Sequence, residues 1–298
     1  MKKSPSIYIV TPIFNSKAVT LRFVKSLKKQ SYKNFKLIVV DDGSDGTLDV
    51  LKADYPEVDV LKGTGDLWWS GGTNLGVKRA LKHKADYILT INHDVTLKPN
   101  YLSSLVACAS LHPKALIGSM VVNREQPEFV WFFGGGYSLR QGLNQHTTGH
   151  IGDFTAPVKS TWLTGMGVLI PAETFRKIGF FDEKNFPLYF GDADFSERAR
   201  RAGYELWVDP RSVVYGDIYD NWVGRNVRYP KLIFLYDLFT IQNSPFQWKS
   251  RRLFYKKYWP GNYRLALLIF YTVGSASVYY GYIVGLINRI IRPGRMQA

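Results

Sequence analysis

The polar and acidic side chains that could perform chemistry follow directly after apolar segments of this sequence. The run from Asp86 to Ile91 contains β-branched residues, is typical of a buried strand, and ends on Asn92, His93 and Asp94. Polar groups at the carboxyl end of a strand lie at the rim of a sheet, where open α/β folds bind ligands. Asp94 could therefore ligate a hard divalent cation on phosphate oxygens, although an aspartate at a strand end is also a common turn former.

Two other acidic segments follow apolar runs. DDGSDGT at 41–47 is either a turn with a helix cap or a place where a carboxylate accepts a hydrogen bond from a base or a ribose. Asp194 and Glu197 have capping-box spacing, which predicts a helix beginning near Asp194. Asp192 has no such explanation. It follows a glycine and an aromatic pair, a setting that can desolvate a carboxylate and make it a general base.

Several other kinds of site are excluded by their missing motifs. GGTNLG at 71–76 departs from GxGxxG because Thr73 replaces the second glycine, and the sequence has no GxxxxGK[ST]. It has no HExxH and no GxSxG, so neither a zinc protease nor a nucleophile elbow is indicated. The glycines at 71–76 could still let a helix approach a ligand, with Asn74 in hydrogen-bonding reach.

Strand and helix patterns alternate through the first half of the chain. Strands are expected at 7–14, 35–40, 58–63, 86–92 and 116–122, and helices at 18–30, 48–53, 71–84 and 99–111. This alternation predicts an α/β fold with a mostly parallel central sheet and helices on both faces. A glycine-broken segment and a polar run at 140–156 then predict a loop that belongs to a binding cleft.

The positive charge is concentrated at the carboxyl end. The 298 residues hold 39 Lys and Arg against 24 Asp and Glu, a net +15. Residues 225–298 hold 12 cations and one acid, Asp237, so they carry +11 and the first 224 residues only +4. Because the basic region is also aromatic and apolar, it favours an anionic membrane surface over nucleic acid. The uncharged stretch 265–288 could span the bilayer, lie in its interface, or pack as a helical hairpin or dimer contact.

The cellular compartment is predicted from the cysteine content. Cys108 is the single cysteine, so no intrachain disulfide can form and a reducing compartment is expected. The first 15 residues lack a small-residue cleavage site and predict a strand, not a signal peptide. With the basic region, these features predict a cytoplasmic protein bound peripherally at the inner face of the cell membrane.

An ordered series of motifs resembles the inverting family 2 glycosyltransferases of the GT-A fold, and most closely their rhamnosyltransferase-like members. The resemblance covers residues 6–216 and rests on TPIFN, VVDDGSDGT, GGTNLG, INHDV, WLTGMGVLIP and FDEKNFPLYFGDADFSERARRAGY. It implies a catalytic domain at 1–224, while the charge and apolar pattern sets off a helical, basic and apolar region at 225–298. It also implies a nucleotide-sugar donor, a glycan or lipid-linked acceptor and a role in bacterial surface polysaccharide synthesis.

The same resemblance implies roles for individual residues. Donor binding falls on Thr11, Pro12, Asn15, Asp41, Asp42, Asn74 and Asn92. The last Asp of the family's DxD motif, which holds Mg²⁺ or Mn²⁺, matches Asp94, and the general base of its ED motif matches Asp192.

Three departures from the family pattern leave an alternative open. Asn92 replaces the first Asp of DxD, Gly191 replaces the Glu of ED, and Gly216 followed by Asp217 stands where many members carry a histidine. A scaffold protein of a polysaccharide-assembly complex, without activity, is the competing prediction.

Overall fold

The computed structural model describes residues 4–138, 143–217 and 234–291. The chain forms two compact units. Unit 1 contains Met1–Gly136 and His146–Asp217, and unit 2 contains Tyr137–Gln145 and Ile218–Ala298. The boundary predicted between residues 224 and 225 lies outside the described residues.

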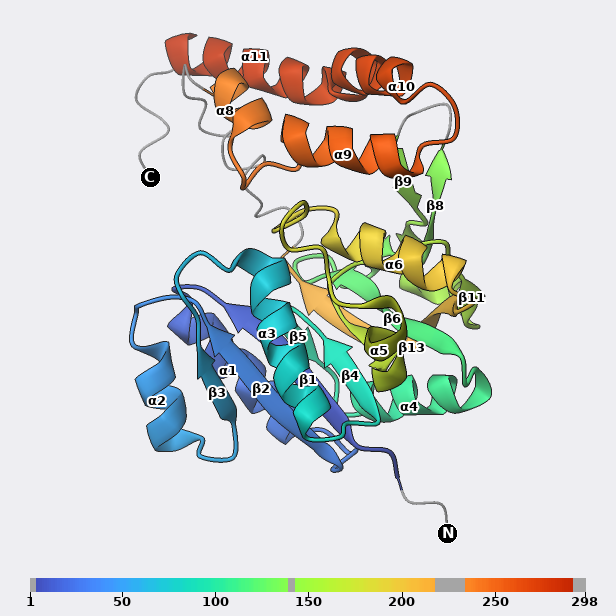
Figure 1. Ribbon diagram of the computed structural model, residues 1–298. Helices are drawn as coiled ribbons and strands as arrows, with labels where there is room; N and C mark the ends of the chain where they lie inside the picture. Colours follow the sequence, from blue (N-terminus) through green and yellow to red (C-terminus); the bar gives the residue numbers. More distant parts are fainter. Residues whose placement is uncertain (1–3, 139–142, 218–233, 292–298) are drawn as a thin grey trace. The chain divides into compact units, whose positions relative to one another are not determined.

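A mixed sheet forms the centre of unit 1 (Figure 1). Its strands are β1 (Ile7–Ile13), β2 (Phe35–Asp41), β3 (Asp59–Lys62), β4 (Tyr87–Thr90), β5 (Val95–Leu97), β6 (Ala115–Asn123), β7 (Phe129–Phe132), β10 (Gly149–His150), β11 (Val158–Lys159), β12 (Val168–Pro171) and β13 (Glu205–Gly216). The main path runs β10-β7-β6-β12-β4-β1-β2-β3, and β13 pairs with β6, β5 and β11. A separate two-stranded sheet joins β8 (Gly135–Ser138) and β9 (Leu143–His146). Part of the predicted 140–156 loop is therefore strand.

The first four strands of the sheet are parallel, as predicted. β1 pairs in parallel with β2 and β4, and β2 pairs in parallel with β3. β12 then enters antiparallel between β4 and β6, while β13 returns parallel to β6. The carboxyl ends of β1, β4, β6 and β13 consequently lie along one edge of the sheet.

Helices flank this sheet, which confirms the predicted α/β class (Figure 1). They are α1 (Lys17–Lys28), α2 (Thr47–Asp54), α3 (Trp68–Lys82), α4 (Tyr101–Leu111), α5 (Ala172–Ile178) and α6 (Gly191–Arg201), with a short 3₁₀ turn η1 (Ile151–Asp153). α3 packs on β1 and β2, and α4 packs on β6 and β13. The buried core of these strands and helices fixes the sheet edge on which the polar residues stand.

The predicted helix start near Asp194 is wrong. α6 begins three residues earlier, at Gly191, after Phe190 adopts a left-handed backbone with φ of 69°. Asp194 is fully buried, and its Oδ2 accepts a hydrogen bond from Arg198 Nε at 2.8 Å, so it forms an internal ion pair instead of a capping box. Asp192 thus lies in the first turn of the helix, where backbone N–H groups are available to a carboxylate.

We expect Gly76→Ala to destabilise unit 1 by about 1–3 kcal/mol. A Cβ at Gly76 would overlap the Val10 side chain and approach Val40 to 3.3 Å, because α3 lies directly on β1 and β2 there. This overpacking outweighs the gain in helix propensity, which is at most about 1 kcal/mol. Chemical denaturation measures the free energy of unfolding, and Lys82→Ala at an exposed position of α3 is the matched control. An equal free energy of unfolding in the Gly76 variant and wild type would contradict the close packing.

Apart from residues of β8 and β9, the described part of unit 2 is helical. Its helices are α8 (Phe234–Thr240), α9 (Trp248–Tyr258), α10 (Tyr263–Ile269), the π-helical turn η2 (Phe270–Gly274) and α11 (Ala276–Ile291). Leu238 and Tyr282 are buried between α8 and α11, and Phe254 and Leu267 are buried in α9 and α10. Within the described residues, Tyr263–Ile287 is long and apolar enough to cross a membrane, by length and composition alone.

Candidate active site

The carboxyl ends of β1 and β4 are joined by His93. Its Nε2 lies 2.7 Å from Ser16 Oγ and its Nδ1 lies 3.2 Å from the Pro12 carbonyl oxygen. Since a carbonyl only accepts, Nδ1 carries the proton and Nε2 accepts from the serine hydroxyl. Burial lowers the pKa of His93, which keeps the imidazole neutral at pH 7. The middle residue of the Asn92–Asp94 triplet is therefore a structural link that orients its two neighbours.

Asp94 is exposed, and its backbone is held by Arg124. Arg124 Nη2 donates to the Asp94 carbonyl oxygen at 2.7 Å and to the Tyr215 carbonyl oxygen at 3.2 Å, while Nη1 pairs with Asp217 Oδ2 at 2.5 Å. One guanidinium thus fixes Asp94, the residue before β5, to the carboxyl end of β13. Among the residues that the structure describes, no hydrogen bond or ion pair engages the Asp94 carboxylate, which leaves its oxygens available to a ligand.

The amino end of α3 is positioned by Asp42. This buried carboxylate accepts from the Gly65 amide at 2.6 Å and from the Leu67 amide at 2.8 Å. The helix begins at Trp68, three residues before the predicted start, with Trp68 in a left-handed backbone at φ of 55°. The side chain of Trp69 is thereby directed from α3 toward the ends of β4 and β12.

Trp69 connects the two halves of the site. Its indole Nε1 donates to Asn92 Oδ1 at 2.8 Å. Its ring lies against Gly165, where a methyl group would approach the indole to 2.7 Å. Gly165 in turn donates its backbone N–H to Asp192 Oδ2 at 3.0 Å. Asn92, Trp69, Gly165 and Asp192 therefore form one continuous series of contacts across the end of the sheet.

Two backbone donors orient the carboxylate of Asp192. Oδ2 accepts from Gly165, and Oδ1 accepts from the Ala193 amide at 2.8 Å in the first turn of α6. Burial raises the pKa of Asp192 above the ordinary range of an aspartate, against a partial lowering by these amides. A carboxylate with a raised pKa is a better proton acceptor than a solvated one, which suits a general base.

A small cavity explains part of this desolvation. It measures about 10 Å³, roughly the space of one water molecule. Its lining contains Asp192 and Trp69 with Thr90, Leu116, Leu163, Gly165, Val168, Ile170, Phe181, Phe195 and Ser196. The inner side of the Asp192 carboxylate therefore faces mostly apolar groups.

Some residues of unit 1 other than glycine, including two close to Trp69 and Asp192 in the sequence, have strained backbone conformations. Asn15, Trp68 and Phe190 all have positive φ, at 44°, 55° and 69°. For residues other than glycine such conformations cost of order 1–3 kcal/mol each and persist where the surroundings enforce them. Trp68 immediately precedes Trp69, and Phe190 stands two residues before Asp192, so strain accompanies both side chains at the centre of the site.

The predicted donor-binding residues occupy the ends of β1 and β2 and one face of α3. Asp41 is buried and accepts from the Gly43 and Leu48 amides at 2.9 and 3.1 Å, and Asn15 Oδ1 accepts from the Ser44 amide at 2.8 Å. Thr11 is buried in β1, and Pro12 lies against α3 at Gly72. These contacts shape the DDGSDGT turn, and direct binding of a nucleotide by its side chains stays a prediction.

Asn74 is engaged by three hydrogen bonds within the protein. Its Nδ2 donates to the Phe181 carbonyl at 2.9 Å and to Glu183 Oε2 at 2.7 Å, and its Oδ1 accepts from the Phe181 amide at 3.0 Å. It ties α3 to the segment that leads into α6. Its predicted contact with the donor is untested, while its hydrogen bonds give it a clear structural role.

The available oxygen donors are compatible with a divalent cation shared with a substrate. No group of three His, Cys, Asp or Glu side chains suited to a metal is present in the described ranges. Mg²⁺ needs only one or two protein carboxylates when phosphate oxygens and water complete its coordination. Asp94 supplies one such carboxylate, so the chain fits a cation that binds together with a diphosphate and not by itself.

Trp69 and Arg124 are absent from the sequence predictions. Trp69 lies two residues before GGTNLG, and Arg124 directly follows β6, two residues beyond the strand predicted at 116–122. The position of Arg124 at a strand end is the same signal that singled out Asp94. Its partner Asp217 lies 93 residues away, so their pairing could only come from the fold.

Comparison with known proteins agrees with this architecture. Residues 8–172, more than half of the chain, match the family model described as glycosyl transferase family 2. An uncharacterized glycosyltransferase of Rickettsia typhi is 23% identical over 184 residues, which cover 60% of this chain and 54% of the relative. An uncharacterized protein of Methanocaldococcus jannaschii is 34% identical over 101 residues, covering 34% and 40%. The chain spans about half the length of the curated relatives it matches.

A solved structure shares the fold. The crystal structure of GalNAc-T7 with UDP, GalNAc and Mn²⁺ matches with a TM-score of 0.60 at 14% identity, covering 84% of this chain and 54% of the other. At that identity the match supports the GT-A fold alone. Together with the family match over residues 8–172, it leads to one conclusion: the chain belongs to glycosyl transferase family 2.

Proposed function

We propose that this protein is an inverting glycosyltransferase that moves a sugar from a nucleoside diphosphate sugar to a hydroxyl group of a glycan or lipid-linked acceptor. The transferred sugar would be a hexose or deoxyhexose, and rhamnose is consistent with the motif series. The product would enter a bacterial surface polysaccharide. The observation that carries the proposal is the series of contacts from Asn92 through Trp69 and Gly165 to Asp192, with Asp94 two residues from its first member.

In the proposed reaction, the acceptor oxygen attacks the anomeric carbon and the bond to the diphosphate breaks in the same displacement. Asp192 takes the proton of the acceptor hydroxyl as the new C–O bond forms, and the diphosphate leaves with the bonding electron pair. One attack from the opposite face inverts the anomeric carbon. A raised pKa and two fixed amide bonds suit Asp192 to this role, because a positioned base needs both orientation and proton affinity.

The leaving diphosphate would stand at the sheet edge beside Asp94. Asp94 would hold Mg²⁺ or Mn²⁺ there, and the cation when bound neutralises charge on the leaving group. Arg124 positions Asp94 through its backbone carbonyl, and the neutral His93 fixes the strand end that precedes it. Asn92, which replaces the first aspartate of DxD, accepts a hydrogen bond from the Trp69 indole and so helps to hold Trp69 in the site.

A donor screen by mass spectrometry tests this function. The protein is incubated with individual nucleotide sugars and Mn²⁺, and release of nucleoside diphosphate is followed with and without chelator. We expect slow hydrolysis of one donor class that stops when the metal is removed. Calorimetry with nucleoside diphosphates gives a second measurement. Binding that requires Mn²⁺ supports the enzyme, whereas absence of binding at millimolar ligand would favour the scaffold alternative.

A further inference from the structure

The helical segment α10-η2-α11 has two unlike faces. Its inner face contains Ala266, Leu267, Phe270 and Tyr282, all no more than 6% exposed. Its outer face carries large apolar side chains that are 47–79% exposed, at Leu265, Leu268, Val273, Tyr280, Ile283, Ile287 and Ile290, here called the apolar stripe. The spacings of three, four and seven place them on one side of a helix, and the spacing of five falls across the π turn η2.

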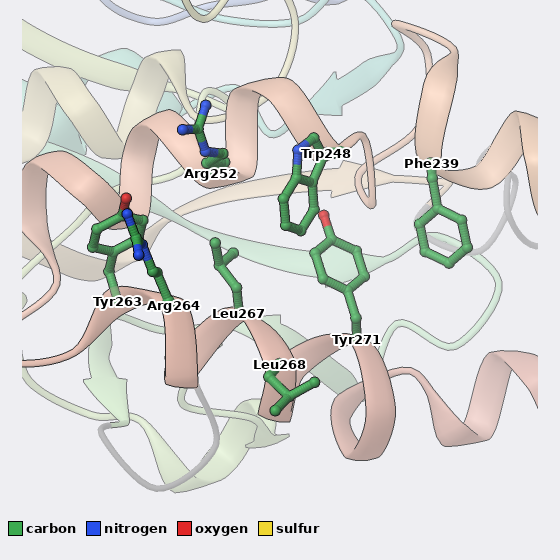
Figure 2. A pocket seen from close by; sticks show the side chains of 8 residues that line it. All are labelled: Phe239, Trp248, Arg252, Tyr263, Arg264, Leu267, Leu268 and Tyr271. Atoms are coloured by element: carbon green, nitrogen blue, oxygen red, sulfur yellow. The ribbon is translucent and has the colours of Figure 1, made fainter.

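A pocket opens beside this stripe within unit 2. It measures about 700 Å³ and is lined by Phe239, Trp248, Arg252, Tyr263, Arg264, Leu267, Leu268 and Tyr271. Figure 2 shows Arg252, Arg264 and Tyr263 toward one end, Leu267 between them and the rings of Trp248 and Tyr271, and Phe239 at the other end. The Tyr271 ring lies 5.3 Å from both Phe239 and Trp248, and its hydroxyl donates to the Phe246 carbonyl at 2.9 Å. The pocket thus has a cationic end and a packed aromatic end.

The charges around the pocket suit an anion. Residues 248–264 contain six cations and no acid. Arg252 and Arg264 are exposed, and within the described part of the chain neither guanidinium has a carboxylate partner. Arginine binds phosphate through two parallel N–H donors, and apolar side chains beside it match a hydrocarbon chain. A phosphate joined to a hydrocarbon chain is the headgroup region of a membrane lipid.

The packing of α10-η2-α11 against α9 distinguishes between two orientations of this segment in a bilayer. Arg251 of α9 is buried, and its guanidinium carbon lies 3.6 Å from the centre of the Phe270 ring. α10 also packs on α9. On α9, the side chains of Lys249, Arg252, Lys256 and Lys257 are exposed to solvent. A spanning orientation would draw these cations into the hydrocarbon core, where charged side chains are costly. An orientation in the plane of the interface leaves them at the level of the headgroups.

We propose that unit 2 docks on an anionic membrane with α10-η2-α11 lying in the plane of the interface. The apolar stripe enters the acyl region, and the pocket holds one lipid whose phosphate binds Arg252 and Arg264. The occupant is a membrane phospholipid. The proposal goes beyond the glycosyltransferase function and does not depend on it, because it rests on unit 2 alone.

Vesicle co-sedimentation of the full chain tests the arginine pair. Wild type should bind vesicles of phosphatidylcholine with phosphatidylglycerol, and bind phosphatidylcholine alone far more weakly. Arg252→Ala with Arg264→Ala should weaken binding about tenfold more than Lys249→Ala with Lys256→Ala, which removes the same charge outside the pocket. Equal losses would mean that unspecific attraction suffices and would overturn the pocket. Soluble glycerol phosphate provides a further test. If it released wild type from the vesicles at concentrations at which the lysine variant stays bound, the pocket would bind a free phosphate and the lipid proposal would be overturned.

The orientation has its own test. Cys108 is buried and is the single cysteine, so a cysteine introduced at an exposed position can be labelled selectively. Labels at Leu265→Cys, Val273→Cys and Ile283→Cys should report one shallow depth when quenched by lipids carrying quenchers at defined depths. A label at residue 273 near the bilayer centre, with the other two near the surfaces, would show a spanning helix and contradict the proposal.

Variants of the apolar stripe separate membrane docking from self-association. Ile283→Asp should reduce vesicle binding at least tenfold, whereas Tyr236→Asp at an exposed position of α8 off the stripe should leave it within about twofold. If the stripe covers a second copy, the protein would be dimeric without vesicles, Ile283→Asp would make it monomeric, and vesicle binding would be unaffected. That outcome would overturn the proposal. Circular dichroism of each variant checks that unit 2 keeps its helical content.

Discussion

Asp192→Asn should lower the rate of sugar transfer by about two to four powers of ten, the usual contribution of a positioned general base. The amide of asparagine keeps the size and one acceptor oxygen of the carboxylate but cannot take a proton. Donor binding should be preserved, because the Asp192 carboxylate accepts from Gly165 and Ala193 and is separated from Asp94 by Trp69 and Asn92. Steady-state kinetics with the identified donor, together with calorimetry of nucleoside diphosphate, measures both properties.

The pH profile gives this prediction a second readout. Burial raises the pKa of Asp192, so the base becomes protonated and inactive at a higher pH than an ordinary aspartate would. The wild-type rate should therefore rise with pH on the acid side, with a midpoint above the ordinary aspartate range near 3.9, and level off once the carboxylate is ionised. In Asp192→Asn this acid limb should disappear from the residual rate.

The control is Asp54→Asn, which makes the same chemical change far from Asp192 in the sequence. Asp54 is an exposed aspartate at the end of α2. Its kinetics and pH profile should match wild type. Circular dichroism and thermal unfolding show whether both variants fold. Undiminished turnover in a folded Asp192→Asn protein would show that Asp192 is not the general base. The contacts from Asn92 through Trp69 and Gly165 to Asp192 would then not support the proposed reaction.

Asp94→Asn should weaken the Mn²⁺-dependent binding of a nucleoside diphosphate and lower sugar transfer by about two to three powers of ten. The physical reason is that Lewis-acid stabilisation of a leaving group contributes several kcal/mol, and each 1.36 kcal/mol is tenfold in rate. Asparagine is neutral and a poorer ligand for a hard cation than a carboxylate. Calorimetry of nucleoside diphosphate with and without Mn²⁺ reads the binding effect independently of activity.

The same experiment tests how the cation is held. Because Asp94 is the one predicted carboxylate ligand, Mn²⁺ alone should bind weakly to wild type and more tightly when diphosphate is present. Asp54→Asn again serves as the control and should retain metal-dependent binding. If Asp94→Asn bound nucleoside diphosphate with the wild-type dependence on Mn²⁺, Asp94 would not be a ligand and the cation would be held elsewhere or not at all.

Local patterns predicted the first half of the fold. The apolar runs near residues 7–14, 35–40 and 86–92 became β1, β2 and β4, because burial on both faces of a parallel strand produces an uninterrupted apolar run. Their order in the sheet did not follow from these patterns, because β4 lies beside β1 and not beside β3. Their parallel pairing did follow from the alternation with helices. The same logic placed Asn92 and Asp94 at the carboxyl edge, which the structure confirms as their position.

Local patterns failed where backbone conformation was set by distant contacts. The capping-box spacing of Asp194 and Glu197 predicted the wrong start of α6, because Phe190 takes a left-handed conformation that no propensity favours. Gly191 packs so closely on Ser70 that a Cβ there would lie 2.6 Å from the serine hydroxyl. Ser70 also donates to the Phe186 carbonyl at 2.6 Å, which holds the segment before α6 against α3.

The sequence by itself determined the residue chemistry: an alternating α/β pattern, carboxylates at Asp94 and Asp192, and a basic, aromatic carboxyl region. Only the tertiary structure decided which of these meet. Trp69 joins Asn92 to Gly165, and Arg124 joins the Asp94 backbone to Asp217, through contacts between residues 23 to 96 positions apart. Such contacts depend on the antiparallel entry of β12 and the return of β13 beside β6. Pairing between distant strands is set by packing of the whole core, and the periodicity of a short segment carries no information about it.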